Sequence, residues 1–214
     1  MKTQYLLANS LDAIPTALQI LGVGGLVSFP TDTVYGVGAL AFDGTAVESI
    51  YAAKDRPNEK AIPVLIGNVS ELDKVASHVP DMALRLASRF WPGPLTLVVP
   101  KNPALPDSVS ANDTVGVRIP DNTIVLNLLR SAGPMAVTSA NISGGKNPTT
   151  AEEVIAQLNG RIELILDGGT TAGGVASTVV DCTQMEPVIL RVGPISLEEI
   201  NSVLSQQFNH NIMF

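Results

Sequence analysis

The stretch that decides the fold is Phe29-Pro30-Thr31-Asp32-Thr33-Val34-Tyr35-Gly36-Val37-Gly38, which follows an apolar run typical of a buried strand. Pro30 has no N–H to donate to a β-ladder, so we expect the strand to end there. Three small polar side chains follow. Two glycines come next, spaced for a backbone that bends or lies close to another segment. Ligands commonly bind where a strand of an α/β protein ends in such residues. The same residues are equally typical of a Pro/Gly turn without a ligand.

The composition limits the classes of protein to consider. The chain has 214 residues, of which 45% are hydrophobic and 15% charged, which is typical of one globular core. Its net charge of −7 argues against a bulk nucleic-acid binder, because phosphate contacts come from Lys and Arg. A single cysteine, Cys182, excludes an internal disulfide, and we expect it to be a small core residue. Neither histidine lies in a motif, which argues against Ser-His or Cys-His catalysis.

The order of the segments predicts the fold class. Strand-like and helix-like segments alternate irregularly, and several strand pairs have no helix between them, which favours a mixed, largely antiparallel α/β sheet. We expect one domain over residues 1–206 and a loosely held tail over 207–214. The expected strands are residues 1–8, 25–29, 61–66, 95–99, 114–120, 135–137, 162–166, 177–181 and 188–191. The expected helices are residues 10–21, 45–53, 70–77, 80–90, 122–131, 151–158 and 196–206.

No apolar run reaches the length that crosses a membrane, and the first residues lack a signal pattern, so we expect a cytoplasmic protein. Trp91-Pro92-Gly93-Pro94 is interpreted as a rigid structural corner, and Asp167-Gly168-Gly169 as a turn.

Polar pairs and isolated cations indicate where the chemistry lies. Several strands end in hydroxyl pairs: Thr31/Thr33, Thr138/Ser139 and Ser177/Thr178. Five of the thirteen basic residues fall in apolar or Gly/Pro-rich segments: Lys54, Arg56, Lys60, Arg118 and Arg191. A buried arginine is costly unless it meets an anion, so this pattern favours binding of a small polyanion such as a nucleotide. No Walker A or dinucleotide glycine motif is present.

Structural explanations of the same residues stay open. The cations from Lys54 to Lys60 could form a solvated turn near the end of a helix. Arg118 and Arg191 could each pair with a carboxylate inside the protein. The Ser139-Ala140-Asn141 segment could be only a turn or a cap.

Taken together, seven segments resemble the YrdC-like threonylcarbamoyl-AMP synthases, in their single-domain TsaC-type form. They occur in the family's order and span nearly the whole chain. The matching segments are Pro30-Thr31-Asp32-Thr33-Val34-Tyr35-Gly36, Lys54-Asp55-Arg56-Pro57, Trp91-Pro92-Gly93-Pro94-Leu95-Thr96, Val117-Arg118-Ile119-Pro120, Ser139-Ala140-Asn141, Ser177-Thr178 and Leu190-Arg191-Val192-Gly193-Pro194.

The resemblance implies a twisted sheet flanked by helices, with a concave and positively lined ligand cavity. It implies a nucleotidyltransferase that converts L-threonine, bicarbonate and ATP, with Mg²⁺, into threonylcarbamoyl-AMP and pyrophosphate. A separate tRNA threonylcarbamoyl transferase complex would then use that product to modify adenosine 37 of tRNA. Direct contact of this chain with tRNA would be weak or absent, and no membrane would be involved.

The resemblance also assigns residues by motif position. Lys54 and Arg56 would be catalytic, with Lys54 contacting phosphate or carbamate. The threonine side would be formed by Thr33, Leu65, Arg118, Val137 and Ser177. The ATP side would be formed by Arg56, Lys60, Thr114, Ser139, Asn147 and Arg191. Metal ligands are not assigned. Asp32 could hold Mg²⁺ indirectly, pair with a cation or set the turn.

Some positions depart from the family pattern. Ala61-Ile62 stands where many members have Pro-Leu, and Leu65 where some have histidine. Ala176 and Val192 also differ from frequent family residues. Three other functions therefore stay in consideration: a paralogous carbamoyl- or acyl-adenylate enzyme with another substrate, a double-stranded RNA or tRNA-binding module, and a nucleotide-binding regulator without turnover.

Overall fold

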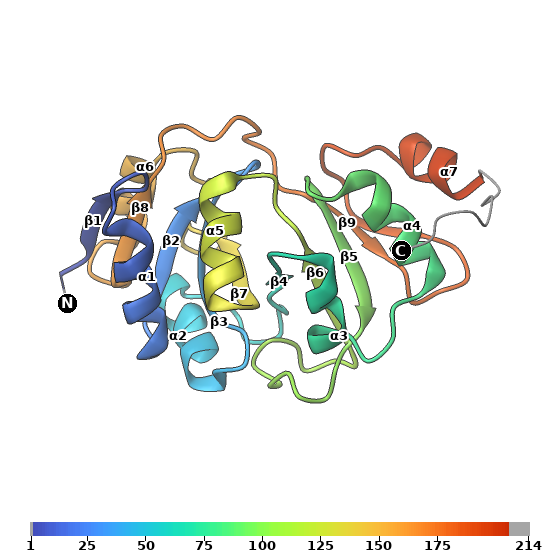
Figure 1. Cartoon of the computed structure of the whole chain (residues 1–214), viewed down its shortest axis with the longest axis horizontal. Helices are drawn as coiled ribbons and strands as arrows, with labels where there is room; N and C mark the ends of the chain where they lie inside the picture. The colour runs from blue at the N-terminus through green and yellow to red at the C-terminus, as the bar shows by residue number, and fades with distance from the viewer. Residues whose placement is uncertain (1, 206–214) are drawn as a thin grey trace.

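A computed structural model describes residues 2–205, which form a mixed ten-stranded sheet with helices on both faces (Figure 1). The expected tail, residues 207–214, lies outside the described residues. Five of the nine neighbouring strand pairs are antiparallel and four are parallel, so the expected α/β class with a mixed, largely antiparallel sheet is confirmed. In spatial order the strands are β1 (Gln4–Leu7), β8 (Leu164–Asp167), β2 (Val27–Pro30), β3 (Tyr35–Leu40), β7 (Met135–Ser139), β4 (Val64–Leu65), β6 (Thr114–Arg118), β5 (Leu95–Pro100), β9 (Thr178–Asp181) and β10 (Val188–Arg191).

The helices begin at capping residues that the sequence supplies. Side-chain oxygens of Asp43, Asn122 and Thr150 accept hydrogen bonds from the first-turn amides of α2, α5 and α6. None of the described helices is long and apolar enough to cross a membrane. The helical elements are α1 (Ala13–Gly22), α2 (Gly44–Lys54), the 3₁₀ turn η1 (Val69–Glu71), α3 (Leu72–Val75), α4 (Asp81–Phe90), α5 (Thr123–Ala132), α6 (Ala151–Leu158) and α7 (Leu197–Ser205).

Side-chain alternation along the strands divides the core between the two faces of the sheet. On β7, Met135 and Val137 join a cluster that α1 and α5 cover, whereas Ala136 between them joins the larger cluster on the opposite face. Figure 1 shows α5 in front of the sheet, with β1 at one end of the molecule and α4 and α7 at the other.

The decisive stretch is a hairpin in which β3 pairs with β2 on one side and with β7 on the other. A Cβ at Gly36 would lie 2.8 Å from Val137 Cγ1, and one at Gly38 would lie 2.7 Å from the Ala136 carbonyl oxygen. Both glycines are needed because Val137 leans across β3. The expectation of a close approach is therefore confirmed. The strand itself was not expected, because its glycines hide the strand pattern.

Three expected elements are wrong in extent. The strand expected over residues 61–66 is reduced to β4, because Pro63 interrupts the ladder and Ile62 N bonds to the Val109 carbonyl instead. The helix expected over residues 70–77 is only η1 and α3, since Ala76 turns extended and bridges to Lys101. The first helix begins at residue 13 rather than at residue 10.

Replacing Gly38 by Ala tests the packing of β3 against β7. The added methyl group has no space, so we expect Gly38→Ala to lower the free energy of unfolding by about 1–3 kcal/mol, measured by urea denaturation. Gly22→Ala is the matched control, because a Cβ there meets nothing within 4 Å. It should leave stability unchanged or raise it by up to about 1 kcal/mol. Equal stability of the two variants would contradict the packing described here.

Candidate functional site

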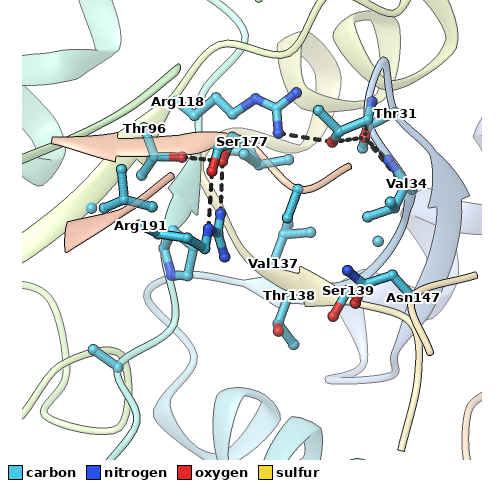
Figure 2. Close-up of a pocket in the computed structure, with 18 of the residues that line it drawn as sticks. Thr31, Val34, Thr96, Arg118, Val137, Thr138, Ser139, Asn147, Ser177 and Arg191 are labelled. Atoms are coloured by element: carbon cyan, nitrogen blue, oxygen red, sulfur yellow. Dashed lines mark hydrogen bonds between the residues drawn. The ribbon is translucent and has the colours of Figure 1, made fainter. Parts of the chain in front are cut away.

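A pocket of about 340 Å³ opens on the sheet face that carries Leu65 and Val137 (Figure 2). Its walls come from the β2–β3 connection, the loop after α2, strands β4 to β7, and the ends of β9 and β10. Alternation along β5 and β6 directs Thr96, Val98, Gly116 and Arg118 to this face. The lining residues are Thr31, Thr33, Val34, Gly36, Arg56, Ala61, Pro63, Leu65, Thr96, Val98, Gly116, Arg118, Val137, Thr138, Ser139, Asn147, Ala176, Ser177, Val179 and Arg191.

Arg118, the last residue of β6, is buried and joins three segments of the chain. Its Nε donates to the Gly93 carbonyl at 2.9 Å, its Nη1 to Thr33 Oγ1 at 3.1 Å, and its Nη2 to Asp32 Oδ1. Burial lowers the pKa of the guanidinium, and the carboxylate of Asp32 opposes that shift. Of the roles left open for Asp32, pairing with a cation is the one observed.

A second network surrounds Ser177, at the start of β9. Arg191 Nε donates to the Ser177 carbonyl and its Nη2 to Ser177 Oγ, both at 2.9 Å. Thr96 Oγ1 lies 2.8 Å from the same Ser177 Oγ (Figure 2). No carboxylate among the described residues pairs with Arg191, which donates instead to two oxygens of Ser177. Its guanidinium therefore stays available to an anion.

The loop after α2 brings Arg56 to the pocket. Arg56 Nε donates to the Lys60 carbonyl at 3.2 Å and its Nη2 to the Ala61 carbonyl at 2.9 Å. Tyr51 holds the base of this loop by donating to the Ser108 carbonyl at 2.8 Å. Lys60 itself is exposed and is not a lining residue.

Lys54, at the end of α2, lies beneath the pocket wall rather than on it. Lys54 belongs to the buried face of α2, which directs its side chain inward, and Asp55 ends the helix in the left-handed conformation, with φ of 50°. Its Nζ donates to the carbonyl oxygens of Ser139 and Asn141. Burial and, to a smaller extent, the nearby charge of Arg56 together lower the pKa of Lys54 to about 7. Direct contact of Lys54 with phosphate stays a prediction.

The Ser139-to-Asn147 segment forms the wall opposite Arg118. Ser139 Oγ donates to Asn141 Oδ1, and Asn141 Nδ2 donates to the carbonyls of Ile142 and Gly145 at 2.8 and 2.9 Å. These bonds hold the loop that presents Asn147 to the pocket. Thus Asn141 is a structural residue of this wall, although it belongs to the same short motif as Ser139.

The pocket brings together nine of the twelve residues that the resemblance assigned. Lys54, Lys60 and Thr114 do not line it; Thr114 lies farther along the same face of β6. The sequence reasoning missed Thr96, whose signal was a polar residue in an otherwise apolar strand. The expectation that Trp91 is structural agrees with its Nε1 bond to the Leu95 carbonyl at 2.7 Å. Cys182 is buried, as expected of a core residue.

The charges in this region are unbalanced. The described lining residues include three arginines and no carboxylate. Arg191 is close enough to contribute to the lowered pKa of Arg118, after burial and against the effect of Asp32, and Arg56 likewise acts on Lys54. Converging like charges are stabilised by a polyanion. Among the described residues no group of three or more His, Cys, Asp or Glu could hold a metal ion.

An open, arginine-lined pocket on a mixed α/β sheet is typical of a protein that binds a small anionic ligand, and comparisons with known proteins show the family. The family model named Sua5/YciO/YrdC, described as "Telomere recombination", matches residues 19–193. The chain therefore belongs to the Sua5/YciO/YrdC family.

Individual relatives are similar over most of this chain. It is 48% identical over 185 residues to a threonylcarbamoyl-AMP synthase of Pyrococcus abyssi, covering 86% of this chain and 54% of that protein. It is 43% identical over 214 residues to that of Bacillus subtilis, covering 95% and 62%. A putative threonylcarbamoyl-AMP synthase of Mycobacterium tuberculosis is 43% identical, with 89% and 88% covered. The chain thus spans only about half to three-fifths of the first two relatives.

Solved structures give the same result. The crystal structure of P. abyssi Sua5 complexed with L-threonine has a TM-score of 0.91 and 43% identity, covering 96% of this chain and 61% of that one. The structure of Escherichia coli YciO has a TM-score of 0.82 and 28% identity, covering 93% and 98%.

The pKa of Lys54 can be measured directly. We expect the ¹⁵Nζ resonance of Lys54, assigned by its loss in Lys54→Met, to titrate with a midpoint of about 7 in the ligand-free protein. The physical reason is that burial beside Arg56 disfavours the ammonium form. A midpoint close to that of exposed lysines would contradict this environment. Because the folded pKa is depressed, the protein's stability should rise as pH increases from about 7 toward the unfolded pKa.

Proposed function

We propose that this chain is an L-threonylcarbamoyladenylate synthase. It would form threonylcarbamoyl-AMP and pyrophosphate from L-threonine, bicarbonate and ATP, and is thus a nucleotidyltransferase. The observation that carries the proposal is a pocket in which three guanidinium groups converge without a lining carboxylate. The names of the relatives at 43–48% identity and the threonine complex of P. abyssi Sua5 support it.

The charge of the proposed reactants explains why such a pocket is needed. The carbamate of threonine is a dianion and ATP is a tetra-anion, so bringing them together is repulsive unless fixed cations lie between them. Arg118 and Arg191 sit on the two hydroxyl networks, while Arg56 enters from the loop after α2. The arginines can therefore bind anions without reorganising the sheet that positions them.

The two hydroxyl networks would bind threonine. A guanidinium carries five N–H groups, and Arg118 uses three of them on protein oxygens, which leaves two for the α-carboxylate. Thr33 and Ser177 would supply hydroxyl contacts, and Leu65 and Val137 would form the apolar floor under the methyl group. This arrangement satisfies both the polar and the apolar parts of a β-hydroxy amino acid.

The opposite wall would bind ATP. Ser139 and Asn147 line the pocket on that wall, while Arg56 lines it from the loop after α2 and Arg191 from the Ser177 network. Lys60 and Thr114 would lie farther along the nucleotide and need not line the pocket of the ligand-free protein. Lys54 would be catalytic, or would act by holding the Ser139 and Asn141 carbonyls and so the wall itself.

The chemistry would need positioning more than a general base. The threonine nitrogen bonds to the carbon of bicarbonate, and water leaves. A carbamate oxygen then attacks the α-phosphorus of ATP in line, and the bond to pyrophosphate breaks. Positioning the reactants can contribute about 7–11 kcal/mol to lowering the barrier. One well-placed donor or cation contributes about 3–4 kcal/mol more.

The metal and the partners follow from the same proposal. With no acidic cluster in the described residues, Mg²⁺ would arrive bound to ATP and keep mostly phosphate and water ligands. The mixed anhydride would pass to a separate tRNA threonylcarbamoyl transferase complex. The net charge of −7 makes direct tRNA contact weak. The proposed site of action is the cytoplasm.

Pyrophosphate release tests the proposal. We expect release from ATP to require both bicarbonate and L-threonine, and to be much slower with L-serine or L-valine. Arg191→Ala and Arg56→Ala should each lower kcat/KM by about 100-fold or more, because each removes a cation from the pocket. Arg130→Ala, which removes an exposed arginine outside the lining set, is the control and should be unchanged. Release that is independent of threonine, or normal in both pocket variants, would contradict the proposal.

A further inference from the structure

Two threonine hydroxyl groups lie in the β2–β3 connection, and the direction of each hydrogen bond that they make can be assigned. Thr31 Oγ1 lies 2.7 Å from the Val34 carbonyl oxygen and 2.9 Å from Thr33 Oγ1. A hydroxyl has one hydrogen to donate, and a carbonyl has none. The Thr31 hydrogen must therefore lie on the bond to Val34, because otherwise two oxygens with lone pairs would face each other at 2.7 Å.

This assignment determines whether the Thr33 hydroxyl can act as a donor or as an acceptor toward the pocket. Since the Thr31 hydrogen is used on Val34, the bond between the two hydroxyls is donated by Thr33. Arg118 Nη1 donates to Thr33 Oγ1 from the other side at 3.1 Å. The order runs from Arg118 to Thr33, from Thr33 to Thr31, and from Thr31 to the Val34 carbonyl (Figure 2). Thr33 Oγ1 is left with one lone pair and no hydrogen to offer to the pocket.

We propose that Thr31 is a specificity-determining positioning residue. By accepting the Thr33 hydrogen, it fixes Thr33 Oγ1 as a hydrogen-bond acceptor that selects a substrate with a hydroxyl group beside its carboxylate. Thr31 does not itself touch the substrate in this role, because its hydrogen is on Val34 and both of its lone pairs are used. One accepts from Thr33 Oγ1, and the backbone amides of Thr33 and Val34 share the other at 3.1 and 3.3 Å. The inference rests on the proposed function, and names the group that reads the substrate hydroxyl.

The position of Thr33 identifies which substrate donor it meets. Arg118 donates to Thr33, so a carboxylate on the free N–H groups of Arg118 lies next to Thr33 Oγ1. Figure 2 shows Arg118 and Thr31 on one side of the pocket, with Ser139 and Asn147 on the other. The substrate nitrogen must face the Ser139–Asn147 side in order to carry the carbamate to ATP. The β-hydroxyl then remains as the donor toward Thr33.

Equilibrium binding tests this inference without depending on turnover. The two ligands are L-threonine and L-2-aminobutyrate, which has the same carbon skeleton without the hydroxyl. Dissociation constants are measured by calorimetry with and without α,β-methylene-ATP, for the wild type and for Thr31→Val, Thr31→Ser and Thr33→Val. Thr171→Val is the matched control, because Thr171 is buried but lies outside the pocket lining. Urea denaturation of each variant verifies that it is folded.

We expect the wild type to prefer threonine over 2-aminobutyrate by about tenfold or more, the ratio that one satisfied hydrogen bond supports. Thr31→Val should lower this ratio to between about one and three, because the freed Thr33 hydroxyl can then turn its hydrogen toward the ligand. Thr31→Ser and Thr171→Val should keep the wild-type ratio. Thr33→Val should lower the preference for threonine to the same extent. The double variant Thr31→Val/Thr33→Val should lower it no further than either single change, because both changes break the same hydrogen-bond chain.

Two results would overturn the inference while leaving the proposed function intact. One is a wild type that binds the two ligands equally. The other is a folded Thr31→Val that keeps the wild-type preference while Thr33→Val loses it. If Thr31→Val does not fold, either of two results overturns the inference. One is loss of the preference for threonine in Thr31→Ser, which keeps the hydroxyl, and the other is a retained preference in Thr33→Val. A wild type that binds neither ligand in either condition contradicts the proposed substrate, and the inference falls with it.

Discussion

The pocket depends on one buried cation, the guanidinium of Arg118. It contacts the Gly93 carbonyl, the Asp32 carboxylate and the Thr33 hydroxyl, and so joins the end of β6 to two segments that are distant in sequence. A buried arginine is tolerated only where its charge and its N–H groups are satisfied. Asp32 supplies the charge and Gly93 a carbonyl, so the residues around Arg118 are constrained together. Because Arg118 ends a strand in the middle of the sheet, this constraint also fixes where the pocket begins.

The other three cations of the site differ from Arg118, because no carboxylate in the described part of the chain pairs with them. Arg56 and Arg191 donate only to carbonyl and hydroxyl oxygens, and Lys54 only to two carbonyls. Burial lowers the pKa of each of these groups. Arg56, Arg191 and Lys54 can therefore interact with a ligand anion without first breaking an ion pair. An overall acidic chain can therefore still bind a polyanion, since the net charge says little about one pocket.

The parts that sequence predicted well are those with a local cause. The helices expected over residues 122–131 and 151–158, the polar strand ends and the isolated arginines all follow from the chemistry of a few neighbouring residues. The parts it missed depend on distant contacts. Gly36 and Gly38 mask the strand pattern of β3, and glycine is required there because Val137 of the neighbouring strand leaves no space for a side chain. Strand β4 is short because the Ile62 amide bonds to the Val109 carbonyl. Lys54 was expected to contact phosphate or carbamate, whereas the structure places it on the buried face of α2, where it donates to the carbonyl oxygens of two residues that are distant in sequence.

The measurement that tests the account most directly is isotope-labelled NMR of the product. The protein is incubated with ATP, ¹³C-bicarbonate and ¹⁵N-L-threonine, and the carbonyl carbon is observed together with phosphorus. The account predicts an ATP-dependent ¹³C signal that couples both to the threonine nitrogen and to the α-phosphorus of AMP, because one carbon then joins the two. Label that remains in bicarbonate, or a carbonyl coupled to nitrogen but never to phosphorus, would contradict it.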